Sequence, residues 1–202
     1  MKIAKQLSIS KRKTDKPVLV LSGASFRLQP SGWVKGATRV RSPNFNRRPK
    51  GMPIELLVIH NISMPPGEFG GNDVAKLFTN RLDWDAHEFY QIIRGLKVSA
   101  HFFIRRDGEV MQFVPCSLRA WHAGASSWRE RANCNDFSLG IEMEGTDTKP
   151  FTDAQYSTLI SLTQLLKRAY PIADITGHSD IAPSRKTDPG PFFDWPRLLG
   201  AI

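Results

Sequence analysis

The clearest hydrophobic pattern in the chain is a short apolar run, IELLVIH, from Ile54 to His60. A run that is apolar at successive positions is typical of a strand buried on both faces, as in the centre of an α/β sheet. A second strand is predicted from Phe137 to Gly145, where alternation places Glu142 and Glu144 on the same face. Because a buried carboxylate is costly unless it is paired, at least one of these glutamates should have a cationic or polar partner.

Helical periodicity is strongest between Thr152 and Tyr170, where leucines recur every three or four residues. Thr152 and Gln155 form a capping box at the start of this predicted helix, and Pro171 ends it. A shorter helix is expected after Asn72, which has the residue type of an N-cap.

Two more strand-like runs, Val98 to Phe103 and Glu109 to Val114, flank Asp107-Gly108 and predict a β-hairpin. Strands and helices alternate along the chain without an internal repeat. The pattern therefore predicts an α/β fold, with a single domain built on a central mixed β-sheet flanked by helices.

The chain of 202 residues is long enough for one domain of ordinary size. We expect that domain over residues 31–202, preceded by a basic flexible arm over residues 1–30 with one short strand at Val18 to Leu21. The turn-rich segment from Gly32 to Pro53 is expected to lie along an edge of the body as irregular structure.

The net charge of +9 is concentrated in the N-terminal quarter of the chain. Residues 1–50 hold thirteen of the 28 Lys and Arg but one of the 19 acidic residues, so residues 51–202 carry a net charge of −3. Such a body is not suited to follow nucleic-acid phosphates, and we expect no nucleic-acid partner. No run of 18 apolar residues indicates a membrane span, and the N-terminal apolar stretch is too short for a signal peptide. Two cysteines without metal spacing suit a reducing compartment. We therefore expect a cytoplasmic protein, most simply a monomer.

Candidate chemistry is densest in TGHSDIAPSRKTDPG, residues 176–190. His178 and Asp188 from this stretch, with His60 at the end of the first predicted strand, are nitrogen and oxygen ligands that suit Zn²⁺. Three protein ligands leave a fourth position for water, as in a catalytic site. Spacing alone does not exclude other ligands, and the rivals are Asp180, His101 and His122.

A zinc site of this kind predicts hydrolysis of an amide or an ester. Glu142 is the candidate to take a proton from water and to return it to the leaving amine. Lys186 is the candidate to stabilise the oxyanion as a point charge.

Several long motifs follow one another along the chain: HNISMPPGEFGG (60–71), VSAHFFIRRDGEVMQFVP (98–115), RAWHAG (119–124), CNDFSLGIEMEGTD (134–147), TDAQY (152–156) and TGHSDIAPSRKTDPGPFFDW (176–195). Through these motifs and their order, the chain from about Ser31 to Trp195 resembles the AmpD family of N-acetylmuramoyl-L-alanine amidases. The resemblance implies an α/β amidase fold shared with peptidoglycan-recognition proteins. It also implies zinc ligands at His60, His178 and Asp188, with the catalytic acid/base and oxyanion groups at Glu142 and Lys186.

By the same resemblance, the substrate is a 1,6-anhydro-muramyl peptide, cut between the muramyl lactyl group and L-Ala of the stem peptide. The implied role is cell-wall recycling, which in some bacteria restrains β-lactamase induction. Substrate contacts are expected at Asn61, Lys97, Trp121 and His122. Members of the family commonly carry Arg in place of Lys97 and a basic residue in place of Asn133, so selectivity for stem-peptide length is expected to differ here.

Three other classes of function compete with the zinc amidase. A peptidoglycan-binding module of the same fold without catalysis is the main alternative, but all three implied zinc ligands are present. A nucleic-acid binder depends on the basic arm alone. A thiol hydrolase using Cys134 has no supporting local signature. Loss of hydrolysis on treatment with a zinc chelator would separate the metal enzyme from all three.

Overall fold

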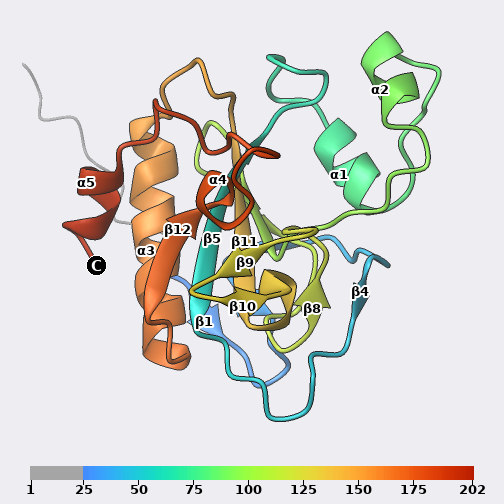
Figure 1. Cartoon of the computed structure of the whole chain (residues 1–202). Helices are drawn as coiled ribbons and strands as arrows, with labels where there is room; N and C mark the ends of the chain where they lie inside the picture. The colour runs from blue at the N-terminus through green and yellow to red at the C-terminus, as the bar shows by residue number, and fades with distance from the viewer. Residues whose placement is uncertain (1–24) are drawn as a thin grey trace, which may run out of the picture.

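The computed structural model describes residues 25–202, and a six-stranded mixed sheet forms their centre (Figure 1). Neighbouring strands along the sheet are β12 (Asp174–Gly177), β5 (Leu56–Ile62), β11 (Ser138–Glu144), β6 (Phe102–Ile104), β7 (Val110–Gln112) and β3 (Thr38–Arg39). The first four run parallel, β7 is antiparallel to β6, and β3 is parallel to β7. The expected α/β fold with a central mixed sheet is confirmed.

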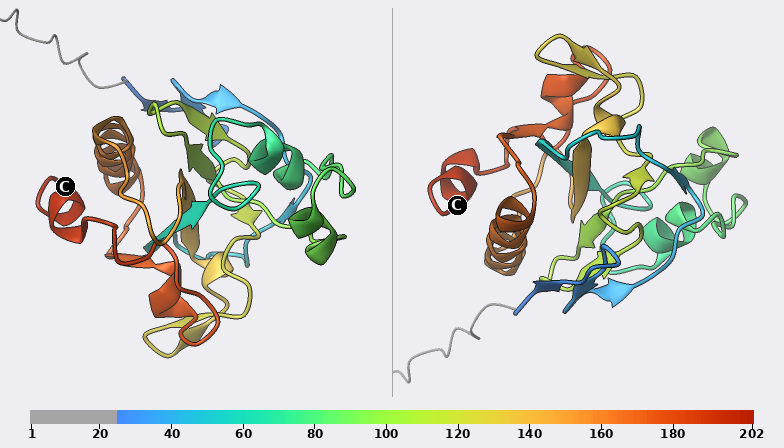
Figure 2. Two further views of the ribbon diagram at one scale, coloured as in Figure 1. Left: turned by 90° about the horizontal axis from the view of Figure 1, so that it is seen from above. Right: turned by 90° about the horizontal axis from the view of Figure 1, so that it is seen from below.

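Helices lie on both sides of this sheet (Figure 2). They are α1 (Asp73–Phe78), α2 (Glu88–Ile92), α3 (Asp153–Ala169), α4 (His178–Ile181) and α5 (Trp195–Leu199). Helices α3 and α5 pack together on one side, whereas α1 and α2 lie on the other (Figure 2). Smaller two-stranded ribbons pair β1 (Arg27–Leu28) with β2 (Val34–Lys35), β4 (Phe45–Asn46) with β8 (Arg119–Ala120), and β9 (Ser127–Trp128) with β10 (Arg131–Ala132).

Side chains along the central strands alternate between the two faces of the sheet. One face packs against α3, and the other carries the polar residues of the candidate site. Leu57 and Ile59 of β5 belong to the same buried cluster as Leu159 and Leu162 of α3. Successive side chains of a strand point to opposite faces, so His60, like Leu56 and Val58, lies on the face away from α3. The long helix therefore covers one face of the sheet and leaves the other to the polar residues.

The ends of the predicted strands differ from the observed ones. β5 does not end at His60 but continues to Ile62, because Asn61 and Ile62 stay paired with Met143 and Glu144 of β11. The hairpin is confirmed, with β6 and β7 antiparallel, but both strands are shorter than predicted. His101 lies just before β6 rather than within it.

The N-terminal segment is more regular than expected. Val18 to Leu21, predicted as a short strand, lies outside the described residues. The segment from Gly32 to Pro53 lies along an edge of the sheet, as predicted, but contains β2, β4 and the edge strand β3. β1 pairs with β2, so the last residues of the expected arm belong to the folded body.

Both predicted helix starts are found, but only one of them is capped in the way that the sequence predicts. The capping box of Thr152 and Gln155 opens α3 as predicted. Asn72 stands at the N-cap of α1 but makes no side-chain cap hydrogen bond. Its Oδ1 instead accepts from Arg105 Nη2 at 2.8 Å, which ties the start of α1 to the hairpin.

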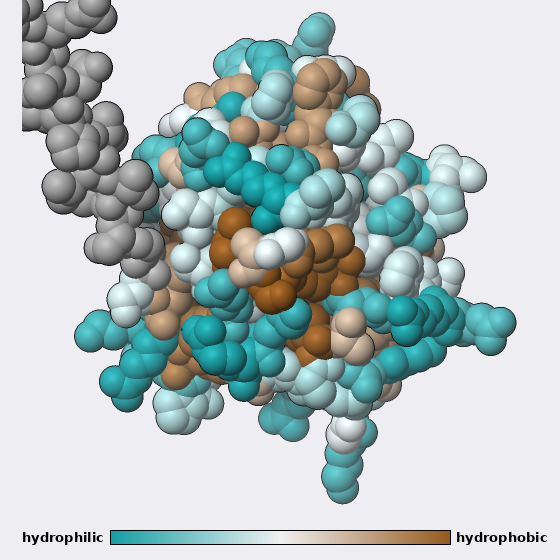
Figure 3. Space-filling view, turned by 90° about the vertical axis from the view of Figure 1, so that its left-hand side faces the viewer, coloured by the Kyte–Doolittle hydropathy of each residue, from teal (hydrophilic) through white to brown (hydrophobic). Residues whose placement is uncertain are grey.

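The side of the molecule that carries α5 leaves some apolar surface uncovered (Figure 3). Apolar side chains reach this surface among hydrophilic ones, and Phe192 and Leu199 near α5 are each 49 % exposed. Among residues 25–202, no helix is long and apolar enough to cross a membrane.

Leu162→Ala on α3 should lower the free energy of unfolding by about 2–5 kcal/mol, because Leu162 is completely buried against the sheet. Lys167→Ala on the exposed side of the same helix is the matched control and should change it by less than about 0.5 kcal/mol. Urea unfolding of both variants measures the difference. Equal losses would contradict the packing of α3 described here.

Candidate active site

Three side chains that are far apart in sequence meet at the carboxyl ends of the parallel strands. His60 comes from β5, His178 begins α4 directly after β12, and Asp188 lies in the loop that follows α4. His60 Nδ1 lies 2.9 Å from His178 Nδ1, and each of these nitrogens lies 3.1 Å from Asp188 Oδ2. The carboxyl edge of an open parallel sheet is the usual place for ligand sites in α/β proteins.

The three converging atoms fit a metal ion. Tetrahedral coordination with bonds of about 2.0–2.1 Å places neighbouring ligand atoms roughly 3.3 Å apart, close to the distances observed here. Two imidazole nitrogens and a carboxylate oxygen are all electron-pair donors, so a cation between them would stabilise an arrangement that is otherwise electrostatically poor. These residues form a buried or half-buried group able to hold a metal ion.

Burial prepares His60 for the role of a metal ligand. Burial lowers the pKa of His60 to about 4, so its imidazole is neutral at pH 7, as a ligand must be. For Asp188, burial alone would raise the pKa, but contacts with His178 and His60 hold it well below its ordinary value. Asp188 is therefore ionised beside the neutral imidazole of His60.

Glu142 lies beside the ligand group in a buried position. It pairs in register with His60 across β11 and β5, so both side chains leave the sheet on the same face. Its Oε2 is buried and has no hydrogen-bond partner among residues 25–202. Burial, and then the charge of Asp188, raise the pKa of Glu142 well above its ordinary value, while Lys186 opposes the shift. A carboxyl group with a raised pKa is suited to exchange protons near neutral pH.

Glu144, two residues further along β11, has a different environment. Its Oε1 accepts from Gly70 N at 2.6 Å and its Oε2 accepts from Arg106 N at 2.9 Å. The expectation that at least one glutamate of this strand is paired is confirmed. Glu144 ties the loop before α1 to the sheet, and Glu142 is the one left available for chemistry.

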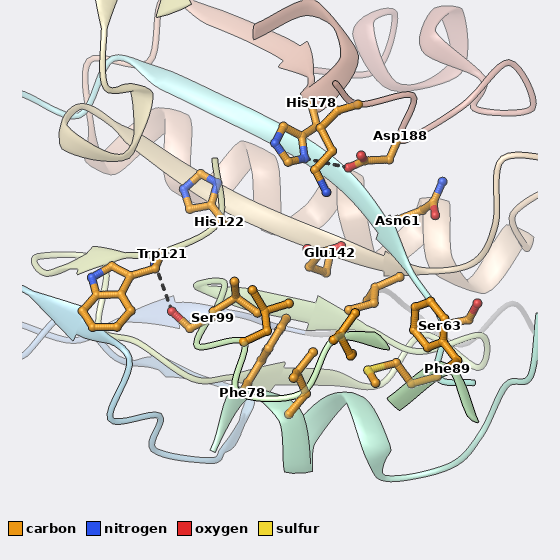
Figure 4. A pocket seen from close by; sticks show the side chains of 17 residues that line it. Asn61, Ser63, Phe78, Phe89, Ser99, Trp121, His122, Glu142, His178 and Asp188 are labelled. Carbon is orange, nitrogen blue, oxygen red and sulfur yellow. Dashed lines mark hydrogen bonds and ion pairs between the residues drawn. The ribbon is translucent and has the colours of Figure 1, made fainter. Parts of the chain in front are cut away.

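A cavity of about 250 Å³ opens beside the ligand group. Polar residues of the site form one side of it, and apolar side chains from the segment between β5 and β6 form the other (Figure 4). The lining includes Asn61, Met64, Phe78, Phe89, Trp121, His122, Glu142, His178, Lys186 and Asp188. The pocket can therefore hold a molecule with both polar and apolar parts against the ligand group.

Three of the four expected substrate contacts, Asn61, Trp121 and His122, line the pocket, and the fourth does not. Trp121 lines the cavity, with its indole N–H donating to Asn46 Oδ1 at 3.0 Å. Asn61 lines it too, and its Nδ2 donates to Asp147 Oδ1 and to Pro189 O, next to the ligand Asp188. Lys97 is exposed and does not line the cavity.

The rival ligands are engaged elsewhere. Asp180 Oδ2 accepts from Thr176 Oγ1 at 2.7 Å and from Gly177 N at 2.8 Å, at the start of α4. His101 is completely buried and its Nδ1 accepts from Gly140 N at 3.0 Å. His122 Nδ1 lies 3.0 Å from His60 Nε2, which is the ring nitrogen of His60 that does not face Asp188 and His178. None of these three side chains joins the ligand group.

Sequence reasoning missed the apolar wall of the pocket. Met64, Phe78 and Phe89 were not singled out, although they lie between His60 and the hairpin. Phe78 and Phe89 follow the loop with Pro65, Pro66 and Gly67, and this loop was the available signal, because loops after sheet strands commonly enclose ligand sites.

Together, a buried group of metal ligands and an unpaired carboxylate beside a pocket define a candidate hydrolytic metal centre. Residues 50–191 match the family model described as N-acetylmuramoyl-L-alanine amidase, and the chain belongs to this family. The protein is accordingly a hydrolytic enzyme, an amidase. The alternative of a binding module without catalysis is not supported.

Individual relatives are similar over most of the chain. The 1,6-anhydro-N-acetylmuramyl-L-alanine amidase AmpD of Salmonella typhimurium (strain SL1344) is 58 % identical over 177 residues, which are 87 % of this chain and 95 % of the relative. A crystal structure of an AmpD selenomethionine derivative superposes with a TM-score of 0.85 at 54 % identity, covering 87 % of this chain and 99 % of the other. The amidase AmiD of E. coli, solved with anhydro-N-acetylmuramic acid-L-Ala-D-γ-Glu-L-Lys, has a TM-score of 0.55 at 30 % identity, covering 77 % and 60 %. The resemblance to AmpD-type amidases noted from the motifs is confirmed.

Proposed function

We propose that this chain hydrolyses the amide bond between the lactyl group of 1,6-anhydro-N-acetylmuramic acid and the L-Ala of its stem peptide. The observation that carries the proposal is the convergence of His60, His178 and Asp188 beside the buried Glu142 at a pocket. The substrate class follows from the similar AmpD amidase of Salmonella and from the muropeptide complex of AmiD.

We propose zinc as the metal of this centre. His60, His178 and Asp188 would hold it, since two imidazoles and one carboxylate with an open fourth position are typical of catalytic zinc. When bound, zinc would polarise the scissile carbonyl and would make a water molecule acidic enough to lose a proton near neutral pH.

Glu142 moves the protons of the reaction in this proposal. As the oxygen of water bonds to the lactyl carbonyl carbon, Glu142 takes a proton from that water. As the carbon–nitrogen bond breaks, Glu142 returns a proton to the departing amine of L-Ala. Its burial and its unpaired Oε2 support this role, because a solvated or ion-paired carboxylate would have a lower pKa.

Lys186 supplies positive charge to the carbonyl oxygen as negative charge develops on it. It lines the pocket together with Glu142 and the ligands. Asn61 is proposed to contact the substrate amide, and Trp121 to offer its ring face to the sugar or peptide.

The proposed biological role is cytoplasmic recycling of cell-wall fragments, which also limits β-lactamase induction by removing muropeptide signals. The amidase domain is proposed to act as a monomer. It begins before residue 31, because β1 (Arg27–Leu28) pairs with β2. The proposed function involves no nucleic-acid or membrane partner.

The products decide whether this function is correct. The purified protein should convert 1,6-anhydro-N-acetylmuramyl-L-Ala-peptide into free 1,6-anhydro-N-acetylmuramic acid and a peptide with a free L-Ala amino group, as judged by mass spectrometry. Cleavage within the peptide, or no cleavage by zinc-loaded protein, would contradict the proposal.

Selectivity for the stem peptide should differ from that of relatives that carry arginine. We expect nearly equal rates on substrates with and without diaminopimelate, because Lys97 and Asn133 offer no guanidinium fork to its carboxylate. The double variant Lys97→Arg/Asn133→Arg should raise the preference for the diaminopimelate substrate by up to about fivefold, since an exposed charge pair is worth about 0.2–1 kcal/mol.

The control for the Lys97→Arg half of this variant is Lys167→Arg on α3, which makes the same chemical change at an exposed position of a distant helix. It should leave the ratio of kcat/KM values unchanged. A strong preference for diaminopimelate in the unaltered protein would show that other residues recognise this group.

A further inference from the structure

His122 lies against the metal centre without belonging to its ligand group. Its ring lies between those of Trp121 and His178 in the view of the pocket (Figure 4). Its Nδ1 lies 3.0 Å from His60 Nε2, and its Nε2 lies 3.3 Å from Ser138 Oγ. The side chain is 8 % exposed, so these contacts are almost wholly removed from solvent.

The hydrogen positions follow from the use of His60 Nδ1 as a ligand atom. A neutral histidine that offers Nδ1 to a cation carries its proton on Nε2. That N–H is buried and needs an acceptor, which His122 Nδ1 provides. His122 then carries its own proton on Nε2, which faces the acceptor Ser138 Oγ. The hydrogen bonds therefore run in one direction, from His60 Nε2 to His122 Nδ1 and from His122 Nε2 to Ser138 Oγ.

The second histidine ligand is held in the same way by the main chain. His178 offers Nδ1 to the ligand group, and its Nε2 lies 3.2 Å from Ala123 O, the residue after His122. One short segment therefore provides the acceptors for both imidazoles.

Gly140 shows that the position of the His122 ring is built into the sheet. A Cβ atom on Gly140 would lie 2.5 Å from His122 Cγ and 2.6 Å from its Nδ1, closer than real contacts allow. The ring thus lies directly against the backbone of β11, where any larger residue would displace it. A glycine inside a buried strand weakens the strand. The close approach of the His122 ring is the physical reason that glycine occupies position 140.

We propose that His122 is a positioning residue of the metal centre, accepting the Nε2 hydrogen of His60 and thereby fixing Nδ1 as the atom that binds the ion. The inference rests on the proposed metal centre and deepens it. His122 also lines the cavity, so the expected contact with substrate stands beside this role. Loss of such a supporting hydrogen bond typically weakens metal binding by about 10–100-fold.

Zinc affinity, measured by competition with a chromogenic chelator, tests this role without any substrate. His122→Leu removes the acceptor and should weaken zinc binding by about 10–100-fold. His122→Asn places a carbonyl oxygen near the former Nδ1 position and should recover most of the affinity. His87→Asn, at the N-cap of α2, is the matched control and should bind zinc like the unaltered chain.

Unchanged zinc affinity in His122→Leu would overturn the proposal, and a raised KM in that variant would assign His122 to the substrate instead. A His122→Asn variant that binds zinc no better than His122→Leu would also overturn the proposal. Because these are affinities, they separate this inference from the proposed amide hydrolysis, which fails if the unaltered chain binds zinc but does not cut the muropeptide.

Two further measurements keep the test independent of the folding of any one variant. Gly140→Ala should displace the ring and weaken zinc binding at least about tenfold, as the Leu variant does. Nitrogen-15 NMR of the unaltered zinc-loaded protein should place the His60 proton on Nε2. A proton on His60 Nδ1 would contradict the proposed arrangement.

Discussion

Glu142→Gln is expected to lower kcat for muropeptide hydrolysis by about 10²–10⁴-fold, the usual contribution of a general acid–base group. The amide keeps the size of the side chain but cannot take a proton from water and return it to the leaving amine. Zinc binding should remain, because Glu142 does not belong to the ligand group. Stability should not fall, since burial of the unpaired carboxylate is unfavourable.

Steady-state kinetics together with zinc analysis of the same preparations measure this effect. Glu130→Gln, an exposed residue in the turn between β9 and β10, is the matched control and should retain full activity. Loss of zinc in the Glu142 variant would assign Glu142 to the ligand group. Retention of kcat within about threefold would remove it from the chemistry, because proton transfer contributes far more.

His178→Ala should lose both zinc and activity. Removing one of three protein ligands weakens zinc binding. Without zinc, the transition state loses charge stabilisation worth several kcal/mol, which corresponds to about 10³-fold or more in kcat/KM. The vacated position leaves Asp188 without one of the contacts that keep its pKa low. His87→Ala removes a histidine outside the site and is the control for general loss of imidazole.

Metal analysis and kinetics on these two variants distinguish a ligand from a group that only lines the pocket. Full zinc content in His178→Ala would place the ion elsewhere. Substantial activity in the zinc-free variant would argue for hydrolysis without a metal.

The elements of the fold could be predicted because their signals are local. The apolar run from Ile54 to His60 and the period from Thr152 to Tyr170 each reflect which face of a single element is buried. The strand ends could not be predicted in the same way. β5 continues to Ile62 because of its pairing with β11, and such pairing depends on segments distant in sequence.

The candidate site was predictable in residue type and partly in identity. His60, His178 and Asp188 were chosen because their atoms suit zinc and because they lie at strand ends or in a rigid loop. His101, His122 and Asp180 offer the same atoms, so chemistry alone could not exclude them. Their contacts in the structure distinguish them from the ligand group. Asp180 caps the start of α4, and His122 contacts the Nε2 atom of His60 rather than its Nδ1 atom.

The supporting residues were the hardest to foresee. Gly140 inside a predicted buried strand was an available signal, since a glycine there indicates a close approach of another group. Which group approaches cannot be known before the hairpin and the RAWHAG segment are placed against β11. The same limit applies to the apolar wall around Phe78 and Phe89, which forms only when the segment between β5 and β6 folds over the site.

Removal and restoration of the metal is the most direct test of the central claim that His60, His178 and Asp188 hold a catalytic zinc ion. The protein is dialysed against a chelator, then titrated with zinc while release of peptide from 1,6-anhydro-N-acetylmuramyl-L-Ala-peptide is followed by mass spectrometry. We predict that activity disappears on dialysis and returns in full at one equivalent of zinc per chain. Hydrolysis that continues in metal-free protein would contradict the account.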